Sequence, residues 1–461
     1  MRYPHYQAIP YQNPLVIFHH FASQKGAIFL DSAEPREGCG RYSFIGVDPF
    51  FILQCQQTET DPFQILEKYL EQYPLENHPD LPPFQGGVAG YFSYDLCHYL
   101  EKIPVMISDM PIPDLLLGFY DLIIAFDQIE KRAWIFSSGY PEKDLSQRAQ
   151  RAQDRCSWLQ QALGKIAPLP PINTVTLDEQ FLHANFTQAE YVCAVTKVMR
   201  AIRAGDIFEA NISQRFKAIM PTGLTAFDLY RRLRCINPAP FSAFLNFDSI
   251  AIASASPERF LKLSEGNVET RPIKGTRPRG KTPEEDQQFA LDLAESEKDH
   301  AENVMIVDLL RNDLSRVCEN FSVNVPQLCH LESYATVHHL VSVIHGTLRK
   351  NQTAIDLLRA TFPGGSITGA PKIRAMEIIA EIEPTARGIY CGCIGYIGFN
   401  GDLDTSITIR TYAIQKNSVT FQVGGAVTLD SDPLAEYHET LTKAAALKKA
   451  FTQIDYLKNE T

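Results

Sequence analysis

The chain has 461 residues, 45% of them hydrophobic and 21% charged, which is an ordinary balance for a globular protein. This length exceeds what one simple core usually spans, so we expect two lobes or a large composite domain. The net charge of −11 argues against nucleic acid or an anionic membrane as a partner. A cationic site in such a chain therefore indicates local recognition of an anionic ligand.

Neither export nor membrane insertion is indicated by the sequence. The first residues, MRYPHYQAIPYQNP, lack the apolar core of a signal peptide, and no apolar run reaches the length of a membrane span. The ten cysteines show no paired spacing, and Cys391 and Cys393 are the nearest two. We expect them to be reduced core residues of a cytoplasmic enzyme.

The first part of the chain has the alternation of β-sheet. Strands are predicted within 41–54, and 115–138 is expected to form two strands around a polar turn. A polar helix is predicted at 143–163, followed by a proline-containing stretch without periodicity. We therefore assign an N-terminal region to 1–165 and a linker to 166–186.

The second part, 187–457, opens with a helix whose two ends are both marked. Thr187 and Glu190 fit a capping box, and Gly205 follows as a C-terminal stop. The later elements are expected to be strands within 249–263, a long helix at 283–317, a helix at 370–382, strands within 392–427 with a hairpin turn at Asn400-Gly401, and a last helix at 433–454. This order is neither a βα alternation nor all-β, so the predicted class is α+β.

Two predicted helices each carry a pair of carboxylates on one face. Asp299 and Glu302 are three residues apart, and so are Glu436 and Glu439. Two such pairs facing each other would form an all-oxygen site suited to Mg²⁺. Either pair alone is more simply explained as a solvated helix face.

Glycine-rich segments and one arginine are candidates for anion binding. The segment TFPGGSITGAPK precedes a helix, and VGGAV permits close approach of a ligand to its backbone. Arg410 is predicted to lie within a strand among apolar neighbours, where a charge needs a buried partner. Tight turns and a structural ion pair are the alternative explanations.

The segment RPIKGTRPRGKT, residues 271–282, is a dense cationic loop around Lys274. From the loop alone, this lysine is a solvated charge, a group that binds an acidic substrate, or a nucleophile. A nucleophilic amine needs a lowered pKa, which burial and neighbouring cations provide. Arg271, Arg277 and Arg279 are the cations nearest in the sequence.

Ordered segments of the second part resemble the chorismate-utilising enzymes. These segments are GDIFEANISQRF, SASPERFL, RPIKGTRPRG, AENVMIVDLLRNDLSRV, HHLVSVIHG, FPGGSITGAPKIRAMEII, GIYCGCIGYIG, TSITIRT, VGGAV and DPLAEYHETLTKA. The family includes component I of anthranilate and aminodeoxychorismate synthases and the isochorismate and salicylate synthases. FLDSA and GRYSFIGVDP in the first part resemble the two amino-transferring members only. The implied fold is a large composite of antiparallel β-sheets packed with flanking helices.

The resemblance also implies roles for individual residues. Glu302 and Glu439 match direct Mg²⁺ ligands, and Asp299 and Glu436 match water-mediated ones. Glu258 matches the general acid that protonates the leaving ring hydroxyl. The positions that match substrate-facing residues are Gly275, Thr276, Thr368, Tyr390, Arg410, Gly424, Gly425, Ala426 and Lys443. His339 matches a histidine beside the ring. Local spacing cannot decide whether His339 or the adjacent His338 has a purely structural, packed position.

Two positions favour one member of the family. The water-adding members carry a lysine base where this chain has Glu209, so isochorismate or salicylate synthesis is disfavoured. The loop of anthranilate synthase reads P-I-A-G-T, whereas Lys274 gives the form of aminodeoxychorismate synthase. In the implied reaction, Lys274 forms a covalent intermediate on the way to 4-amino-4-deoxychorismate, the first step toward p-aminobenzoate and folate. Relatives usually carry glutamine at the position of Glu209, so here the acid is protonated, turned away or paired with a cation such as Arg215.

Ammonia in this family comes from a glutamine amidotransferase, and no Gly-x-Cys-x-Gly elbow occurs here. We therefore expect a separate amidotransferase subunit in a heterodimer. A pocket resembling the tryptophan site of anthranilate synthase is expected at Ser32, Tyr42, Ser43, Phe44, Pro238, Ala239 and Pro240, with tryptophan as a structural ligand or the pocket empty. Anthranilate synthase component I is the main alternative, and a non-catalytic ligand-sensing relative is disfavoured because Glu258 and all four metal carboxylates are present.

Overall fold

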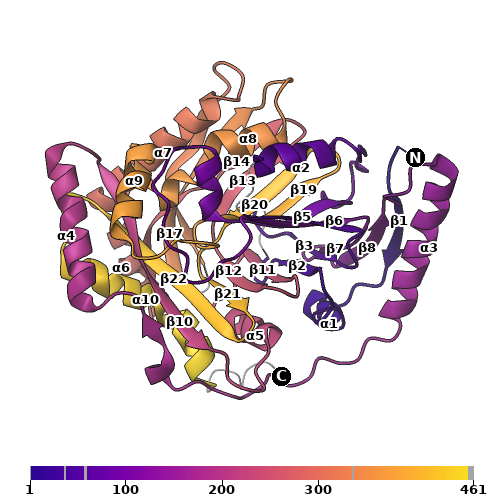
Figure 1. The fold of residues 1–461 in the computed structure, drawn as a ribbon, viewed down its shortest axis with the longest axis horizontal. Coiled ribbons are helices and arrows are strands. Elements are labelled where there is room, and N and C mark those ends of the chain that lie inside the picture. Colours follow the sequence, from indigo (N-terminus) through magenta and orange to yellow (C-terminus); the bar gives the residue numbers. More distant parts are fainter. Residues whose placement is uncertain (1, 36–37, 57–59, 335–336, 455–461) are drawn as a thin grey trace.

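The computed structural model describes residues 2–35, 38–56, 60–334 and 337–454. Two large β-sheets with helices on their outer faces make up the fold (Figure 1). All strand pairings within these residues are antiparallel, which confirms the α+β class of antiparallel sheets with flanking helices.

The first sheet has 12 strands. In spatial order they are β1 (His5–Ile9), β8 (Arg132–Ser137), β7 (Leu122–Asp127), β3 (Tyr42–Gly46), β2 (Ala27–Asp31), β11 (Phe241–Asn246), β12 (Ala251–Ser256), β21 (Thr411–Gln415), β22 (Ser418–Val427), β10 (Glu209–Ile219) and β18 (Gly369–Ala370), with β9 (His183–Ala184) also paired to β10. The segment before the predicted linker thus supplies five of these strands, the later segment supplies six, and β9 lies within the predicted linker itself.

The second sheet has 10 strands. Their spatial order is β15 (Ile273–Pro278), β17 (Val337–Thr347), β14 (Asn267–Thr270), β13 (Arg259–Ser264), β20 (Leu403–Ile407), β19 (Cys393–Gly398), β5 (Gly87–Phe92), β6 (Leu115–Tyr120) and β4 (Phe51–Cys55), with β16 (Asn324–Ser333) also paired to β17. Here again β19 of the later segment pairs directly with β5 of the earlier one. The division at 165 and 187 stays a sequence-based prediction, because strands from both sides of it are joined in both sheets.

The helices and short 3₁₀ turns connect and cover the sheets. They are α1 (Pro14–His19), α2 (Pro62–Leu70), η1 (Tyr94–Tyr99), α3 (Leu145–Leu163), η2 (Glu179–Phe181), α4 (Gln188–Ala204), α5 (Ala226–Ile236), α6 (Pro283–Ala294), α7 (Glu297–Ser315), α8 (Ala354–Thr361), η3 (Gly365–Ile367), α9 (Lys372–Ile382) and α10 (Pro433–Thr452). The two that matter for the site are α7, which packs on β15 and β17, and α10, which packs on β22.

A hydrophobic core fills the space between the two sheets. Ile28 and Leu245 of the first sheet pack there with Tyr91 and Ile394 of the second. Each is at most 2% exposed. Further cores lie under the outer helices. Because the cores are continuous with both sheets, the packing fixes how the sheets lie relative to each other.

Several helix and turn predictions are confirmed. The capping box of α4 is complete, since the Thr187 and Glu190 side chains each accept a hydrogen bond from the other's backbone N–H. Gly205 ends α4 with a left-handed φ of 83°. The hairpin turn between β19 and β20 contains Gly401 with φ 89°, a conformation that favours glycine.

Three element predictions are wrong in detail. Residues 115–138 form three strands, because the fully buried Asp121 separates β6 from β7. The Asp121 carboxylate forms an ion pair with Arg155. The predicted helix at 283–317 is two helices, since the Ser296 hydroxyl caps a new helix by accepting from the Asp299 N–H. Arg410 lies between β20 and β21 with a left-handed φ of 51°, not within a strand.

The ten cysteines all lie in the described part of the chain, and none forms a disulfide. Seven of them are buried, as expected for reduced core residues, but Cys193 is exposed and Cys235 and Cys329 are only partly buried, so these three do not fit the prediction. Within the same residues, no helix combines the length and apolar character that a membrane crossing needs.

Candidate active site

Lys274 lies where the two sheets meet. Its Nζ is 2.6 Å from Oε1 of Glu209, the first residue of β10. Lys274 is on β15 of the second sheet, so this ion pair joins the two sheets. The Lys274 side chain is 7% exposed and that of Glu209 is 0% exposed. The prediction offered Arg215 as a cation for Glu209, but the partner is the proposed nucleophile itself, and Arg215 instead pairs with Asp109.

Gly275 gives β15 the shape that turns Lys274 inward. The register with β17 shifts between Lys274 and Thr276, and Gly275 has φ +82°. A Cβ on Gly275 would lie 3.0 Å from the Cβ of Asp299 on α7. Glycine is therefore required here both for its backbone angle and for the close approach of α7.

The charge environment of Lys274 differs from the one predicted. Burial disfavours the ammonium, but the nearby carboxylates of Glu209 and Glu302 outweigh it and raise the pKa of Lys274. The three arginines expected to lower this pKa are each paired with a carboxylate elsewhere: Arg271 with Glu332, Arg277 with Asp299, and Arg279 with Asp286. In the resting protein Lys274 is therefore a charged ammonium.

Glu258 is a buried acid between β12 and β13. Its side chain is 4% exposed, and burial raises its pKa to about 7. Its Oε1 accepts a 2.6 Å hydrogen bond from the Ser366 hydroxyl on η3. The positive charge of Lys274 works against this rise in pKa, because it favours the ionised form of Glu258. A carboxyl that is partly protonated near neutral pH suits a general acid.

The two adjacent histidines have different surroundings because successive residues of β17 face opposite sides. His339 Nδ1 lies 2.8 Å from the Thr276 hydroxyl, next to Lys274 and Gly275 on β15. His338 lies 2.8 Å from the Ser333 hydroxyl and 3.0 Å from Asp286 at the start of α6. His338 thus has a structural position, whereas His339 lies opposite Thr276 of β15, the strand that carries Lys274.

Carboxylates of α7 and α10 face each other across a positive group. The Nζ of Lys298 is 3.8 Å from Oε1 of Glu302 and 3.8 Å from Oε1 of Glu436. Burial raises the pKa of Glu302 to about 7 and also raises that of Glu436, whose Oε1 accepts from the Ser431 hydroxyl. The space between these helices therefore already attracts a cation.

The other two predicted metal ligands, Asp299 and Glu439, each form an ion pair with a basic side chain. Asp299 pairs with Arg277 at 2.9 Å, and the exposed Glu439 pairs with Lys443 at 2.7 Å. No group of three or more His, Cys, Asp or Glu side chains in metal-binding range occurs in the residues that the structure describes. The oxygen donors and the cation-binding character of the space nevertheless fit Mg²⁺.

The glycine segment of β22 lies against the carboxylates of α10. A Cβ on Gly425 would lie 3.2 Å from Oε2 of Glu436 and 3.5 Å from Oε1 of Glu439. The Nζ of Lys443 donates a 2.9 Å hydrogen bond to the carbonyl of Gly424. Because β22 pairs with β10, Gly424 to Ala426 run alongside Asn211 to Ser213, close to Glu209. The structure therefore gathers the glycines, α10 and the Lys274–Glu209 pair in one region.

Thr368, Tyr390 and Arg410 are the remaining predicted substrate residues. Thr368 is fully buried, and its hydroxyl donates a 3.0 Å hydrogen bond to the Gly364 carbonyl. Tyr390 is 9% exposed, and burial raises its pKa well above the usual value. Arg410 is partly buried, and its positive charge favours the ionised form of Glu258. None of the described residues forms an ion pair with Arg410. A cation in this position is suited to an anionic ligand.

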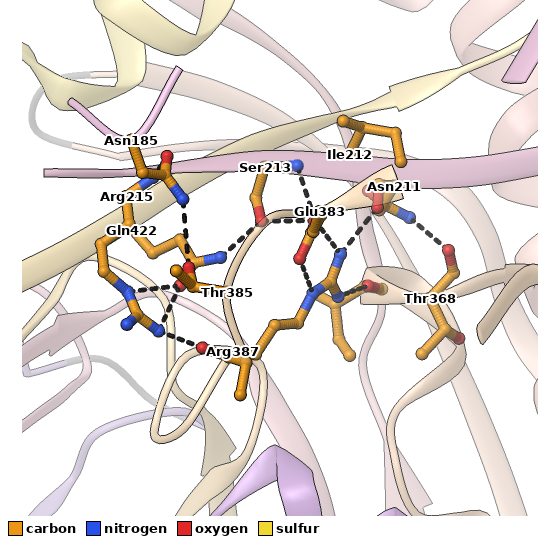
Figure 2. A network of polar contacts seen from close by, with 12 residues as sticks. Asn185, Asn211, Ile212, Ser213, Arg215, Thr368, Glu383, Thr385, Arg387 and Gln422 are labelled. Atoms are coloured by element: carbon orange, nitrogen blue, oxygen red, sulfur yellow. Dashed lines mark hydrogen bonds and ion pairs between the residues drawn. The ribbon is translucent and has the colours of Figure 1, made fainter. Parts of the chain in front are cut away.

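A buried polar network that sequence reasoning missed supports this region (Figure 2). Arg387 pairs with Glu383 at 2.8 Å, and the two side chains are 0% and 1% exposed. Glu383 also accepts from the backbone and hydroxyl of Ser213, and Arg387 donates to the carbonyls of Ile367 and Asn211. The network thereby fixes η3 and the end of α9 to β10, beside Glu209. The spacing Glu383 to Arg387 is an i,i+4 pair and was the available signal, but it equally fits an exposed helix face.

The predicted tryptophan-like pocket coincides in part with a cavity of about 220 Å³ between the sheets. Ser32, Tyr42, Phe44 and Pro240 line it, together with Asp31 of the FLDSA motif and with charged side chains that were not predicted, namely Arg41, Arg259, Lys262 and Asp404. Pro238, Ala239 and Ser43 are not among the lining residues, and the Ser43 hydroxyl instead accepts from the Ser32 N–H at 2.9 Å. Tryptophan as its ligand stays a prediction.

Comparison with known proteins identifies the family. The model of chorismate binding enzymes matches residues 26–449, which is most of the chain. The chain belongs to this family. The resemblance carried by the sequence motifs is thus confirmed at the level of the chorismate-binding enzymes, and the geometry above is that of a family member.

The named relatives are of two kinds. The chain is 38% identical over 451 residues to anthranilate synthase component 1 of Thermus thermophilus, which covers 95% of each chain. It is 40% identical over 432 residues to aminodeoxychorismate synthase component 1 of Salmonella typhimurium, covering 90% of this chain and 91% of that one. The solved structure of anthranilate synthase component I from Streptococcus pneumoniae aligns with a TM-score of 0.79 and 32% identity, over 88% and 92% of the two chains. Similarity alone therefore leaves the specific reaction of this chorismate-binding enzyme open.

Proposed function

We propose that the protein makes 4-amino-4-deoxychorismate from chorismate and ammonia. The observation that carries this proposal is the position of Lys274, whose amine is buried where the two sheets meet. The negative charges of Glu258 and Glu302 both favour the protonated form of that amine. This amino group can react with a bound substrate once its ammonium form has lost a proton. The resemblance described above implies that anthranilate synthases lack this lysine.

The proposed reaction is a two-step displacement. Lys274, as the free amine, attacks ring carbon 2 of chorismate, and Glu258 protonates the hydroxyl that leaves from carbon 4 as water. Ammonia then attacks carbon 4 of the adduct, and the bond between carbon 2 and the lysine nitrogen breaks. The enolpyruvyl group is retained. The pKa of about 7 for Glu258 supports its role as the acid, because part of Glu258 is protonated at neutral pH.

The other site residues bind and orient the substrate in this proposal. Arg410 and Tyr390 hold the enolpyruvyl carboxylate with the backbone of Gly424 to Ala426. Gly275, Thr276, Thr368 and Lys443 face the substrate, and His339 lies beside the ring. Glu302 and Glu439 would hold Mg²⁺ directly, and Asp299 and Glu436 through water. Mg²⁺ when bound supplies positive charge for the ring carboxylate of chorismate.

Ammonia is supplied in this proposal by a separate amidotransferase subunit. The relatives named component 1 support a multi-component enzyme. The catalytic site of an amidotransferase needs an exposed nucleophile, and both cysteines of the nearest motif, Cys391 and Cys393, are buried. The chain therefore works with a partner or with free ammonium.

Anthranilate synthesis is the second candidate, and the 38% identity to the Thermus thermophilus relative is the observation that favours it. Product analysis separates the two. Purified protein is incubated with chorismate, Mg²⁺ and ammonium, and the products are resolved by chromatography. We expect aminodeoxychorismate, which an added lyase converts to p-aminobenzoate, and we expect its formation to stop when a chelator removes Mg²⁺. Fluorescent anthranilate as the product would overturn the proposal.

The role of Lys274 is tested in the same assay. Lys274→Ala should lose the covalent adduct that forms when ammonium is withheld, measured as a mass increase of chorismate less water on the intact protein. The matched control is Lys281→Ala, because Lys281 is exposed in the same cationic segment. The control should form the adduct as the unmodified protein does. An adduct that persists in Lys274→Ala would show that another residue is the nucleophile.

A further inference from the structure

The Lys274–Glu209 ion pair presents a chemical problem, since the proposed nucleophile is held as an ammonium. An ammonium has no electron pair to donate, so its proton must leave before it attacks. Lys274 is 7% exposed, which restricts direct transfer of this proton to solvent. A group inside the site has to accept it.

We propose that Glu209 accepts the proton of the Lys274 ammonium and returns it when the lysine leaves the substrate. This inference rests on the proposed function, because it concerns the same covalent step. It assigns a role to an acid where the resembling enzymes usually carry glutamine, a side chain that cannot take up a proton at neutral pH.

The contact geometry supports a direct transfer. The 2.6 Å between Nζ and Oε1 is the short distance of a charge-assisted hydrogen bond along which a proton moves without an intervening water. The remaining contact to Oε1 is a weak one from the Asn211 amide at 3.5 Å. The second oxygen, Oε2, is buried and has no hydrogen-bond partner within the described residues. Oε2 is thus free of donors from these residues and can carry the proton, while Oε1 has only the weak second contact from Asn211.

Burial also brings the charged and neutral forms of the pair closer in energy. Glu209 is 0% exposed, and an ion pair out of contact with water loses much of the solvation that stabilises its charges. After transfer, both members are neutral and neither charge is left uncompensated.

The other charged groups around the pair do not serve as the acceptor. Glu302 on α7 and Glu258 between β12 and β13 both act on the charge of Lys274. Among the described residues, however, Glu209 is the carboxylate that forms an ion pair with its Nζ. Glu258 has to hold its own proton for the departing hydroxyl. Of the two remaining acids, Glu209 is therefore the one placed for the transfer.

The protons balance through the whole cycle. Glu209 takes a proton from Lys274, and the free amine forms a bond to carbon 2 while Glu258 gives its proton to the hydroxyl that leaves as water. Ammonia bonds to carbon 4, and the lysine departs with its electron pair as a neutral amine. The new ammonium on carbon 4 gives one proton to Glu258, and Glu209 returns its proton to Lys274. Both acids regain their starting states.

This mechanism predicts a particular pH dependence. With Glu209 present, activation of Lys274 moves a proton within the pair and does not change the number of protons bound. With Glu209→Gln, the proton has to leave to solvent, so the amine concentration rises about tenfold per pH unit below the pKa of the lysine. Titration of Glu258 affects the unmodified protein and the Glu209→Gln variant alike, so its effect cancels in the ratio of their rates.

The test measures the rate of adduct formation with chorismate and Mg²⁺, without ammonium, across about pH 6 to 9. We expect the ratio of the Glu209→Gln rate to the unmodified rate to rise about tenfold per pH unit from the acidic end. A ratio that is constant with pH would overturn the role of Glu209. Glu332→Gln is the matched control, because it removes the carboxylate paired with Arg271 in the same segment and should give a constant ratio near one.

A second variant guards against a purely structural effect. Glu209→Ala leaves a space beside Lys274 that small molecules can occupy. Added formate should restore adduct formation, whereas formamide, which has the same shape but accepts no proton, should not. Equal rescue by both would overturn the inference. If the unmodified protein forms no adduct at all, the proposed function fails; if it forms one and the ratio is constant, only the role of Glu209 fails.

Discussion

At the scale of single residues, burial decides the chemistry of the site more than sequence neighbours do. Glu258 and Glu302 both have their pKa raised to about 7 because their carboxylates are removed from water. The arginines near Lys274 in sequence are instead occupied by their own carboxylates. The site thus holds the buried ammonium of Lys274 and two acids near their titration point, which is the combination that proton transfers at neutral pH require.

The pKa of Glu258 predicts how the rate depends on pH. A general acid works in its protonated form, which is present below its pKa and lost as the pH rises through about 7. Adduct formation by the unmodified protein should therefore fall by about tenfold per pH unit well above that value. Glu258→Gln should lower the rate by about 10²–10⁴-fold at acidic pH and remove this decline. Stopped-flow or quenched-flow measurement of the adduct tests both, and a decline that persists in Glu258→Gln would assign it to another group.

At the scale of secondary structure, the site depends on elements joined by buried polar contacts. The end of α9 and the following loop are fixed to β10 by Glu383 and Arg387, which lie beside Ser213 and Asn211 in Figure 2. β10 also carries Glu209, so this network positions the strand that faces Lys274. Removing one member of a buried ion pair leaves the other charge uncompensated.

Glu383→Ala should therefore destabilise the protein by about 3–5 kcal/mol, because Arg387 would remain charged and fully buried. Glu377→Ala is the matched control on the same helix, since its partner Arg374 is 41% exposed and the expected cost is at most about 1 kcal/mol. Urea unfolding followed by circular dichroism measures both. Equal effects of the two variants would mean that the Glu383–Arg387 pair has no special structural role.

At the scale of the whole molecule, the early and late segments of the chain are built into the same sheets. β2 pairs with β11 in the first sheet, and β5 pairs with β19 in the second. The core between the sheets also takes side chains from both segments. The candidate site residues of the late segment thus rest on a scaffold that the early segment completes (Figure 1).

The late segment alone, residues 187–461, should fail to fold cooperatively. Without the early segment, β11 and β19 lose a neighbouring strand and the inter-sheet core is left open to water. Near-ultraviolet circular dichroism and urea unfolding of this piece test the expectation, with co-expressed 1–186 as the control that restores the missing strands. A cooperative transition of 187–461 by itself would instead support the sequence-based division into domains.

Features set by near neighbours in the chain could be predicted well. The capping box of α4 needs only Thr187 and Glu190, and the hairpin at Asn400-Gly401 needs only its turn residues. The ordered motifs of the late segment likewise indicate the family, because each motif is a continuous run of residues. The break at Asp121 was missed because it depends on a buried contact with Arg155, a residue 34 positions away.

The sequence by itself determined the family, most of the elements and the identities of the candidate site residues, because these depend on local patterns and ordered motifs. Only the tertiary structure decided which charges meet. Lys274 and Glu209 are 65 residues apart and lie on different sheets, yet their side chains are in direct contact. Packing of the sheets, which buries both groups, is the physical reason that this pair forms.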